Sequence, residues 1–272
     1  MRALLRKPAP PLDAFVNSIH YFEAPLRPYA RERVMPDGCP MLIVNLSEDR
    51  TRIYDRKDPG RGETINGCIL VGAQTEYNII DTAGQVKIAG VHFKPGGAYP
   101  FLAPPADELH GAQLPLDVLW GRFANQMRER MLEAETPEEC LTIMEQALLA
   151  RARRPLFRHR AVEFALLEFR REPHSQTIGE VTEKTGLSPR RFIEVFRQEV
   201  GMTPKLFCRL RRFQQAIRRY SAGKPVEWTE VALEAGYFDQ AHFIHDFRAF
   251  SGINPSAYAA ARTQYHNHVR LD

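Results

Sequence analysis

Apolar residues follow a short-strand pattern in the first part of the chain. Runs of four to eight apolar or β-branched residues separated by turn residues are typical of strands. From about residue 13 to 110 these runs are Met41–Leu46, Thr51–Tyr54, Cys68–Gly72, Tyr77–Ile80 and Val86–Phe93. The turns between them are at Pro36–Gly38, Asp58–Gly60, Asn66–Gly67, Ala83–Gly84 and Pro95–Gly97. Many short strands predict a small β-barrel or sandwich over residues 1–112.

In residues 113–152 the apolar residues are spaced three or four positions apart, and this spacing predicts two helices. In the first, over Leu116–Leu132, apolar residues recur every four positions, at Leu119, Phe123, Met127 and Met131. The second begins at Thr136 with Thr-Pro-Glu-Glu, a capping box with proline at the first helical position. It is expected to bury Leu141, Met144, Leu148 and Leu149. The pair either covers the open side of the barrel or forms a dimer interface, and residues 153–157, with Pro155, form the expected linker.

The last hundred residues contain an internal repeat. Val181 and Gly186 recur after 50 residues as Val231 and Gly236. The spacing then becomes 51, for the pairs Phe192/Phe243, Phe196/Phe247, Gly201/Gly252 and Pro204/Pro255. One inserted residue in the second copy accounts for the change. Repetition at a fixed period predicts two copies of one structural unit.

Each copy has the parts of a helix-turn-helix. A short helix, about 177–185 or 228–235, ends at a glycine that can adopt the left-handed conformation of a tight turn. Ser188 or Asp239 then caps a second helix, whose apolar residues lie on one face and leave the other to solvent. This combination predicts a helix pair that reads DNA.

Residues Thr203–Gly223 connect the two copies and are expected to form one basic helix. About twenty residues would span about 30 Å, close to the roughly 34 Å of one B-DNA turn. Such a connector would let both second helices enter successive major grooves. Its basic residues are Lys205, Arg209, Arg211, Arg212, Arg218 and Arg219.

Residues 158–262 resemble the DNA-binding domain of the AraC/XylS family of bacterial transcription regulators. The residues that carry the resemblance are Leu187-Ser188, Phe192, Phe196-Arg197, Gly201–Pro204, Phe207, Arg212-Phe213 and Ala216, then Val231-Ala232, Ala235–Tyr237, Phe243, Phe247-Arg248, Ser251-Gly252, Pro255 and Tyr258. The resemblance implies a seven-helix domain over 158–265 with two motifs, promoter DNA as the partner, and contact with RNA polymerase. Arg33–Gly38 (R-x-x-P-D-G) and Gly90–Gly97, containing F-x-P-G-G, resemble a cupin-like N-terminal domain found in one subset of these regulators. Members of the family pair through their N-terminal halves, so a homodimer is also expected.

The candidate DNA-reading residues lie opposite the apolar face of each second helix. They are Arg190, Arg191, Ile193, Glu194 and Arg197 in the first copy, and Gln240, Ala241, His242, Ile244, His245 and Arg248 in the second. Arginine suits guanine, glutamine suits adenine, and alanine or isoleucine suits the thymine methyl group. Arg197 and Arg248, one turn further on, are expected to contact phosphates. Glu194 departs from the basic or polar residue usual in the family, and we expect it to pair with Arg190.

The N-terminal part offers candidates for binding but none for catalysis. Arg33, Asn45 and His92 are the residues we expect to face a barrel interior and bind a small effector. Metal-dependent cupin chemistry needs two histidines and a glutamate at close spacing, whereas His20, His92 and His110 stand apart. The Pro-Asp-Gly around Asp37 is first of all a turn. We therefore expect no metal, no cofactor and no enzymatic activity.

Charge and cysteine spacing agree with a DNA-binding protein of the cytoplasm. Residues 1–150 carry a net charge of −4 and residues 151–272 a net charge of +8, and a basic domain suits a polyanionic partner. The four cysteines are far apart without a C-x-x-C pair, and no apolar run reaches membrane-span length. The fold class is therefore α+β with two domains, a β-rich one and an all-α one.

Two other functional classes stay open. A dual-function protein would fuse an enzyme or alkyl-transfer repair domain to the DNA-binding module, which requires an activated cysteine or a four-cysteine zinc site. A protein-interaction module would use its helix-turn-helices for protein contacts, and would lack the basic C-terminal half.

Overall fold

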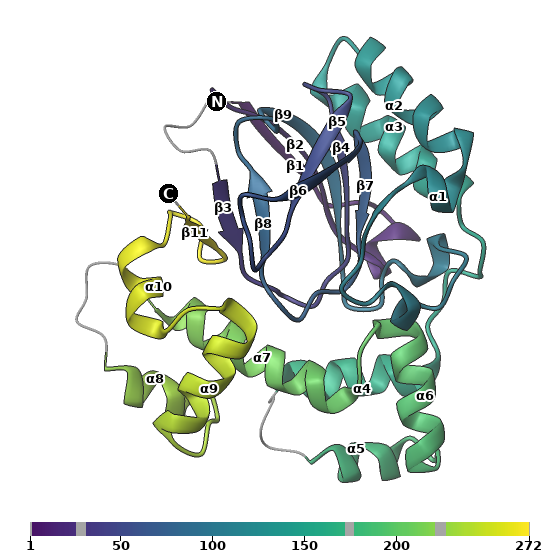
Figure 1. Ribbon diagram of the computed structural model, residues 1–272. Helices are drawn as coiled ribbons and strands as arrows, with labels where there is room; N and C mark the ends of the chain where they lie inside the picture. The colour runs from purple at the N-terminus through teal and green to yellow at the C-terminus, as the bar shows by residue number, and fades with distance from the viewer. Residues whose placement is uncertain (1, 26–30, 172–176, 221–226, 272) are drawn as a thin grey trace.

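The computed structural model describes residues 2–25, 31–171, 177–220 and 227–271 (Figure 1). Strands and three helices form an N-terminal part, and a second group of helices forms a C-terminal part below it in the view of Figure 1. The fold is therefore α+β with a β-rich and a helical domain, as the sequence predicts.

The strands form open antiparallel sheets in the N-terminal part. Their bounds are β1 Arg2–Arg6, β2 Val16–Glu23, β3 Arg31–Val34, β4 Met41–Asn45, β5 Arg50–Tyr54, β6 Gly62–Asn66, β7 Cys68–Val71, β8 Asn78–Asp81, β9 Lys87–Phe93, β10 Gln113–Pro115 and β11 His268–Arg270. They are arranged in a six-stranded sheet, β1-β2-β9-β4-β7-β10, a three-stranded sheet, β11-β3-β8, and a two-stranded sheet, β5-β6. The closed barrel that the sequence allowed is not formed by the described residues, because these sheets do not join into one ring.

Helices close one side of the six-stranded sheet. Their bounds are α1 Asp117–Trp120, α2 Arg122–Glu133 and α3 Pro137–Ala150, and three 3₁₀ turns are η1 Leu12–Ala14, η2 Tyr99–Phe101 and η3 Ala106–Leu109. The single helix expected over Leu116–Leu132 is divided, because Gly121 adopts φ of 62° and ends α1. Met127, Met131, Leu141 and Met144 are at most 2% exposed and belong to the core of the sheet.

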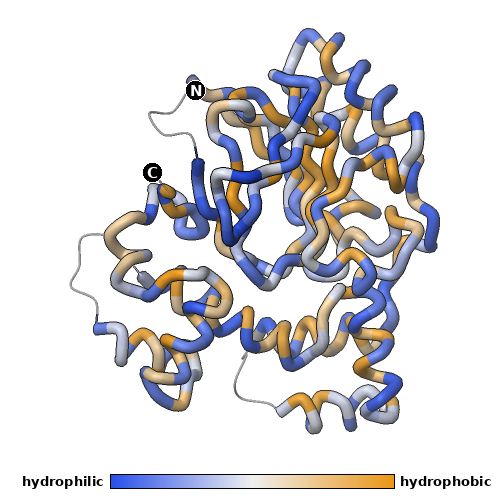
Figure 2. Tube along the Cα trace, viewed as in Figure 1, coloured by the Kyte–Doolittle hydropathy of each residue, from blue (hydrophilic) through white to orange (hydrophobic). Residues whose placement is uncertain are grey.

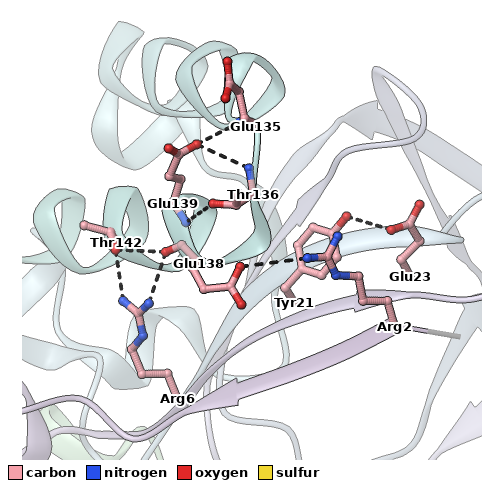
Figure 3. Close-up of polar contacts among 9 residues, drawn as sticks. All are labelled: Arg2, Arg6, Tyr21, Glu23, Glu135, Thr136, Glu138, Glu139 and Thr142. Atoms are coloured by element: carbon pink, nitrogen blue, oxygen red, sulfur yellow. Dashed lines mark hydrogen bonds and ion pairs between the residues drawn. The ribbon is translucent and has the colours of Figure 1, made fainter.

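The predicted capping box at Thr136 is confirmed, and it places α3 against the sheet edge. The Thr136 hydroxyl accepts from the Glu139 amide at 3.2 Å, and the Glu139 carboxylate accepts from the Thr136 amide at 3.3 Å (Figure 3). Arg6 of β1 donates to the Thr142 hydroxyl and to the Glu138 carbonyl, both at 3.1 Å. These contacts support the interpretation that the helices cover the sheet, while the dimer interface stays a prediction.

Among the described residues, the C-terminal part contains seven helices, the number that the family resemblance implies. They are α4 Arg160–Arg171, α5 Ile178–Lys184, α6 Pro189–Val200, α7 Pro204–Arg219, α8 Trp228–Glu234, α9 Gln240–Ser251 and α10 Pro255–Ala261. The connector α7 is shorter than expected, because Tyr220 has ψ of 114° and ends it. Its 16 residues span about 24 Å. Residues 221–223 of the expected connector lie outside the described residues.

The segment after α10 leaves the helical part and joins the N-terminal sheets, which the sequence did not indicate. Strand β11 pairs antiparallel with β3, with Val269 opposite Arg33. Val269 is 3% exposed within the apolar core of the helices, and that core also includes Met35 and Ala73 of the N-terminal part. The two domains therefore share an apolar interface, and Figure 2 shows hydrophobic segments running through both.

Two adjacent leucines of α3 give a matched test of this packing. Leu148 is fully buried, whereas Leu149, which the sequence predicted to be buried, is 47% exposed. We expect Leu148→Ala to lower the free energy of unfolding by about 2–5 kcal/mol, and Leu149→Ala to lower it by less than about 1 kcal/mol. Urea unfolding followed by tryptophan fluorescence measures both changes. Equal losses would show that α3 does not pack in this orientation.

Candidate nucleic-acid interface and adjoining cavity

The first motif forms through the caps that the sequence predicts. Thr177 begins α5 with a capping box to Glu180. Gly186 adopts φ of 71° in the turn, and the Ser188 side chain accepts from the Arg191 amide at the start of α6. Gly201, with φ of 87°, ends α6. The left-handed glycines allow α5 and α6 to meet at a tight turn without a clashing Cβ atom.

The second motif repeats this construction. Gly236 has φ of 80°, and the Asp239 side chain accepts from the His242 amide at the start of α9. Gly252 ends α9 with φ of 71°. The start of α8 differs, because Glu227 provides no side-chain cap there. Trp228 instead holds this helix by packing its ring on Phe243 at 5.9 Å and on Tyr220 at 5.4 Å.

Helix α7 contributes aromatic residues to the cores of both motifs. Phe207 contacts Phe196 of α6 at 5.7 Å between ring centroids. Phe213 contacts Phe247 of α9 at 5.2 Å. All four rings are at most 3% exposed. The two motifs therefore occupy opposite ends of one helix, on the side away from the sheets (Figure 1).

A buried ion pair that could not be predicted from residue spacing holds α9 against α7. Asp246 of α9 is 1% exposed and accepts from Arg209 of α7 at 2.6 Å. His242 and His245 of the recognition helix lie 3.8 and 3.6 Å from the same carboxylate. A buried carboxylate requires such a cation, so Arg209 fixes α9 in place instead of facing DNA.

The predicted DNA-reading residues lie on the solvent side of their helices. The exposed ones are Arg190, Arg191, Ile193, Glu194, Arg197, Gln240, Ala241, His245 and Arg248, and His242 and Ile244 are partly exposed. One predicted contact is wrong. Glu194 pairs at 2.9 Å with Arg191, not with Arg190, because Arg191 precedes it by three positions on the same side of α6.

Helix α6 also contacts an acidic turn of the N-terminal domain. Arg197, predicted to contact phosphate, pairs with Asp107 of η3 at 3.1 Å. A cleft of about 460 Å³ separates the two elements. Its lining consists of Pro105, Asp107, Glu108, Arg190, Ile193, Glu194, Arg197 and Gln198. The side of α6 that is predicted to read DNA therefore faces two carboxylates of η3.

A cavity of about 700 Å³ lies among the strands of the N-terminal domain. Its apolar wall includes Met41, Ile43, Ile69 and Ile88. The polar residues of its lining include His20, Glu32, Asp37, Cys39, Gln74, Asp81 and His92. Residues Tyr265–His268, which follow the last helix of the C-terminal domain, form part of the same wall. An occupant of this cavity would thus touch both domains.

The three predicted effector residues lie in different places. His92 lines the cavity. Asn45 is fully buried and organises a turn, donating to the carbonyls of Arg50 and Gly84. Arg33 faces the helical domain, where it stacks 4.1 Å above the Tyr77 ring and donates to the Ser251 carbonyl at 2.9 Å.

Asp37, Cys39 and His92 meet at the cavity wall, a cluster that the sequence analysis missed. The Asp37 carboxylate lies 2.8 Å from His92 Nε2, and one donor atom from each of the three residues lies within 4.8 Å of the others. Burial raises the pKa of the Cys39 thiol well above its usual value. The pairing of β4 with β9, which sets Met41 opposite His92, could have revealed this proximity, but only once the strand order was known.

In comparisons with known proteins, the helical domain matches a helix-turn-helix family. Residues 181–261 match a family described as "Helix-turn-helix domain". Residues 5–115 match one described as "Domain of unknown function (DUF6597)". The chain is 30% identical over 95 residues to an uncharacterized HTH-type transcriptional regulator of Haemophilus influenzae, covering 35% of this chain and 32% of that protein. It thus spans about a third of the length of that curated relative.

Two solved structures are also similar to the chain. ToxT from Vibrio cholerae is 9% identical, with a TM-score of 0.48, covering 89% of this chain and 97% of that one. A probable AraC family transcriptional regulator from Rhodopseudomonas palustris is 28% identical, with a TM-score of 0.34, covering 38% of this chain and 96% of that one. Within the described residues, no helix is both long and apolar enough to cross a membrane.

The cavity wall makes the stability of the protein depend on pH through His20. Burial, followed by the nearby His92, lowers the pKa of His20 to about 4. The unfolded chain, with a histidine pKa of about 6.5, then binds more protons than the folded one between pH 6.5 and 4. We therefore expect the free energy of unfolding to fall over this window as pH decreases, by at most about 3 kcal/mol from this residue.

Urea unfolding at several pH values tests this expectation. His20→Gln should flatten the pH dependence between pH 6.5 and 4. An identical slope in the wild type and His20→Gln would contradict the assignment.

Proposed function

We propose that the protein is a transcription regulator of the AraC/XylS type that binds promoter DNA through both helix-turn-helix motifs. The observation that carries the proposal is the placement of two capped, solvent-facing second helices, α6 and α9, at opposite ends of the rigid helix α7. The match of residues 181–261 to a helix-turn-helix family and the net charge of +8 over residues 151–272 support it. The proposal includes no catalytic step.

The exposed faces of the two helices have different chemistry and are expected to read different bases. On α6, Arg190 can donate two hydrogen bonds to guanine, while Ile193 can contact a thymine methyl group. On α9, Gln240 suits adenine and Ala241 suits thymine. Arg197 and Arg248 follow one turn later and are placed to contact phosphates. A homodimer would double this site, and RNA polymerase is the expected partner at the promoter.

We further propose that a ligand in the 700 Å³ cavity modulates DNA binding. The cavity is largely apolar with several polar groups, which is the usual composition of a small-molecule site. Its wall includes the segment that follows α10, so a ligand would contact the same segment that connects the helical domain to β3. A ligand that binds one arrangement of the two domains more tightly would shift the population toward it.

A gel-shift titration in salt tests the function directly. Full-length protein is mixed with its own upstream region and, separately, with a random duplex of equal length. We expect tighter binding to the upstream region and a linear fall of log affinity with log salt, because phosphate contacts release counterions. A salt-independent association, or none with either duplex, would contradict the proposal and favour the protein-interaction alternative.

Arg190→Ala tests base reading by α6. We expect it to weaken specific binding by about 1–3 kcal/mol and to relax the preference at one base position. Arg122→Ala removes the same charge from the exposed start of α2 and should leave affinity unchanged. Equal losses by Arg190→Ala on specific and random DNA would show that Arg190 contacts only phosphate.

Asp107→Asn tests whether η3 competes with DNA for α6. Arg197 must exchange Asp107 for a phosphate when DNA binds, so removing the carboxylate should raise DNA affinity about two- to five-fold, the value of an exposed ion pair. Asp49→Asn, at an 89% exposed side chain paired with Arg128, is the matched control. Unchanged or weaker binding by Asp107→Asn would show that η3 already lies clear of the DNA.

A further inference from the structure

The cluster of Asp37, Cys39 and His92 has the geometry of a metal site. Asp37 and Cys39 lie in the loop before β4, and His92 lies on β9. The Phe93 amide donates to the Pro40 carbonyl at 3.1 Å, which fixes the loop beside β9. Gly38 makes the turn with φ of 76°, and the Cys39 amide donates to Asp37 Oδ1 at 2.9 Å. The other Asp37 oxygen is thereby directed at His92 Nε2, 2.8 Å away.

The donor atoms of the cluster select one class of metal. A carboxylate oxygen, a sulfur and an imidazole nitrogen are ligands of zinc and its neighbours in the first transition row, whereas magnesium and calcium prefer oxygen alone. We propose that Asp37, Cys39 and His92 bind one divalent transition-metal ion, of the zinc class, at the wall of the cavity. Metal binding at this cluster does not depend on the proposed function. An effect of the metal on DNA affinity does rest on the proposed function, because it requires that the protein bind DNA.

Metal binding at this cluster balances charge and protons. When the ion binds, the Cys39 thiol loses its proton to solvent, and the neutral His92 ring carries its single proton on Nδ1, which leaves Nε2 free to bind the metal. The resulting thiolate and the Asp37 carboxylate together neutralise a divalent cation. Burial, and then Asp37, raise the pKa of the Cys39 thiol, and Arg211 and Arg218 of α7 and Arg170 of α4 offset this rise only in part. Asn17 contacts the other ring nitrogen, Nδ1, at 3.2 Å, and its amide can orient the imidazole as a supporting contact.

A histidine of the C-terminal segment lines the same cavity as the site. His266 lines the same cavity, and its Nε2 atom is buried with no hydrogen-bond partner among the described residues. Asp37 is close enough to act electrostatically on this ring. The Tyr258 hydroxyl donates to the His266 carbonyl at 2.8 Å, which connects the residue to α10. His266 is not among the donor atoms that lie within 4.8 Å of one another, so it can take the fourth position only if the C-terminal segment moves toward the site, and the ion would then join the two domains.

Cobalt titration of the metal-free full-length protein tests the site without DNA. We expect one Co²⁺ ion per chain, with a thiolate-to-cobalt charge-transfer band and the visible spectrum of a tetrahedral ion, displaced by Zn²⁺. Cys39→Ser should abolish the charge-transfer band, and His92→Asn should weaken Co²⁺ binding at least about 10-fold, the lower limit seen even for supporting residues. Cys208→Ser and His245→Asn are the matched controls and should bind as the wild type does.

Circular dichroism of each variant shows whether it folds. The number of Co²⁺ ions bound per wild-type chain tests the site even if a variant does not fold. A wild type without the charge-transfer band, or a Cys39→Ser protein that is folded and retains the band, would overturn the proposal. Loss of the band in Cys208→Ser alone would also overturn it, because the thiolate would then lie elsewhere.

A second measurement separates the metal site from its effect on DNA. We expect His266→Asn to retain the charge-transfer band and to lose the change in DNA affinity that Zn²⁺ causes in the wild type. If metal binding leaves wild-type DNA affinity unchanged, the proposed coupling between the domains is wrong. The metal site would still be supported by the charge-transfer band of bound cobalt.

Discussion

The apolar face of α7 is the constraint on which the rest of the structure depends. It supplies Phe207 to the core of the first motif and Phe213 to the core of the second. Neither α6 nor α9 can therefore change its angle without disturbing its packing against α7. Dispersion and burial hold both ends, and the ion pair between Arg209 and Asp246 fixes the rotation of α9. Because close-packed aromatic cores resist small deformations, α7 holds α6 and α9, the two helices proposed to read DNA, at a defined separation.

The same helical domain also packs against the N-terminal domain. Tyr77 donates its amide to the Phe250 carbonyl at 3.0 Å and crowds Gly252, where an added Cβ would lie 2.3 Å from the ring. The C-terminal strand β11 extends the small sheet, and His268 contacts the fully buried Glu32 at 2.7 Å. The segment that leads from α10 into β11 also forms part of the cavity wall, which is why we propose that an occupant of the cavity affects the helical domain.

Local signals predicted the helical domain well, whereas contacts between distant residues escaped the sequence. Gly186, Ser188, Gly236 and Asp239 each act within a few residues of themselves, so their roles could be predicted from spacing alone. Strands β1 and β2 carry no turn-bounded apolar run, and β11 forms only because β3 offers it an edge. Asp37 and His92 are 55 residues apart and meet only through the β4–β9 register. Tertiary packing also decided that Leu149 points outward while its neighbour Leu148 is buried.

Hydroxyl-radical footprinting of the full-length protein on its own upstream region tests the central claim most directly. Two recognition helices fixed to one helix predict two protected segments on the same face of the duplex, about one turn or 10–10.5 base pairs apart. They also predict that 5 base pairs inserted between the segments abolish joint protection, because the second groove then faces away. A single protected segment, or two whose protection survives that insertion, would contradict the account.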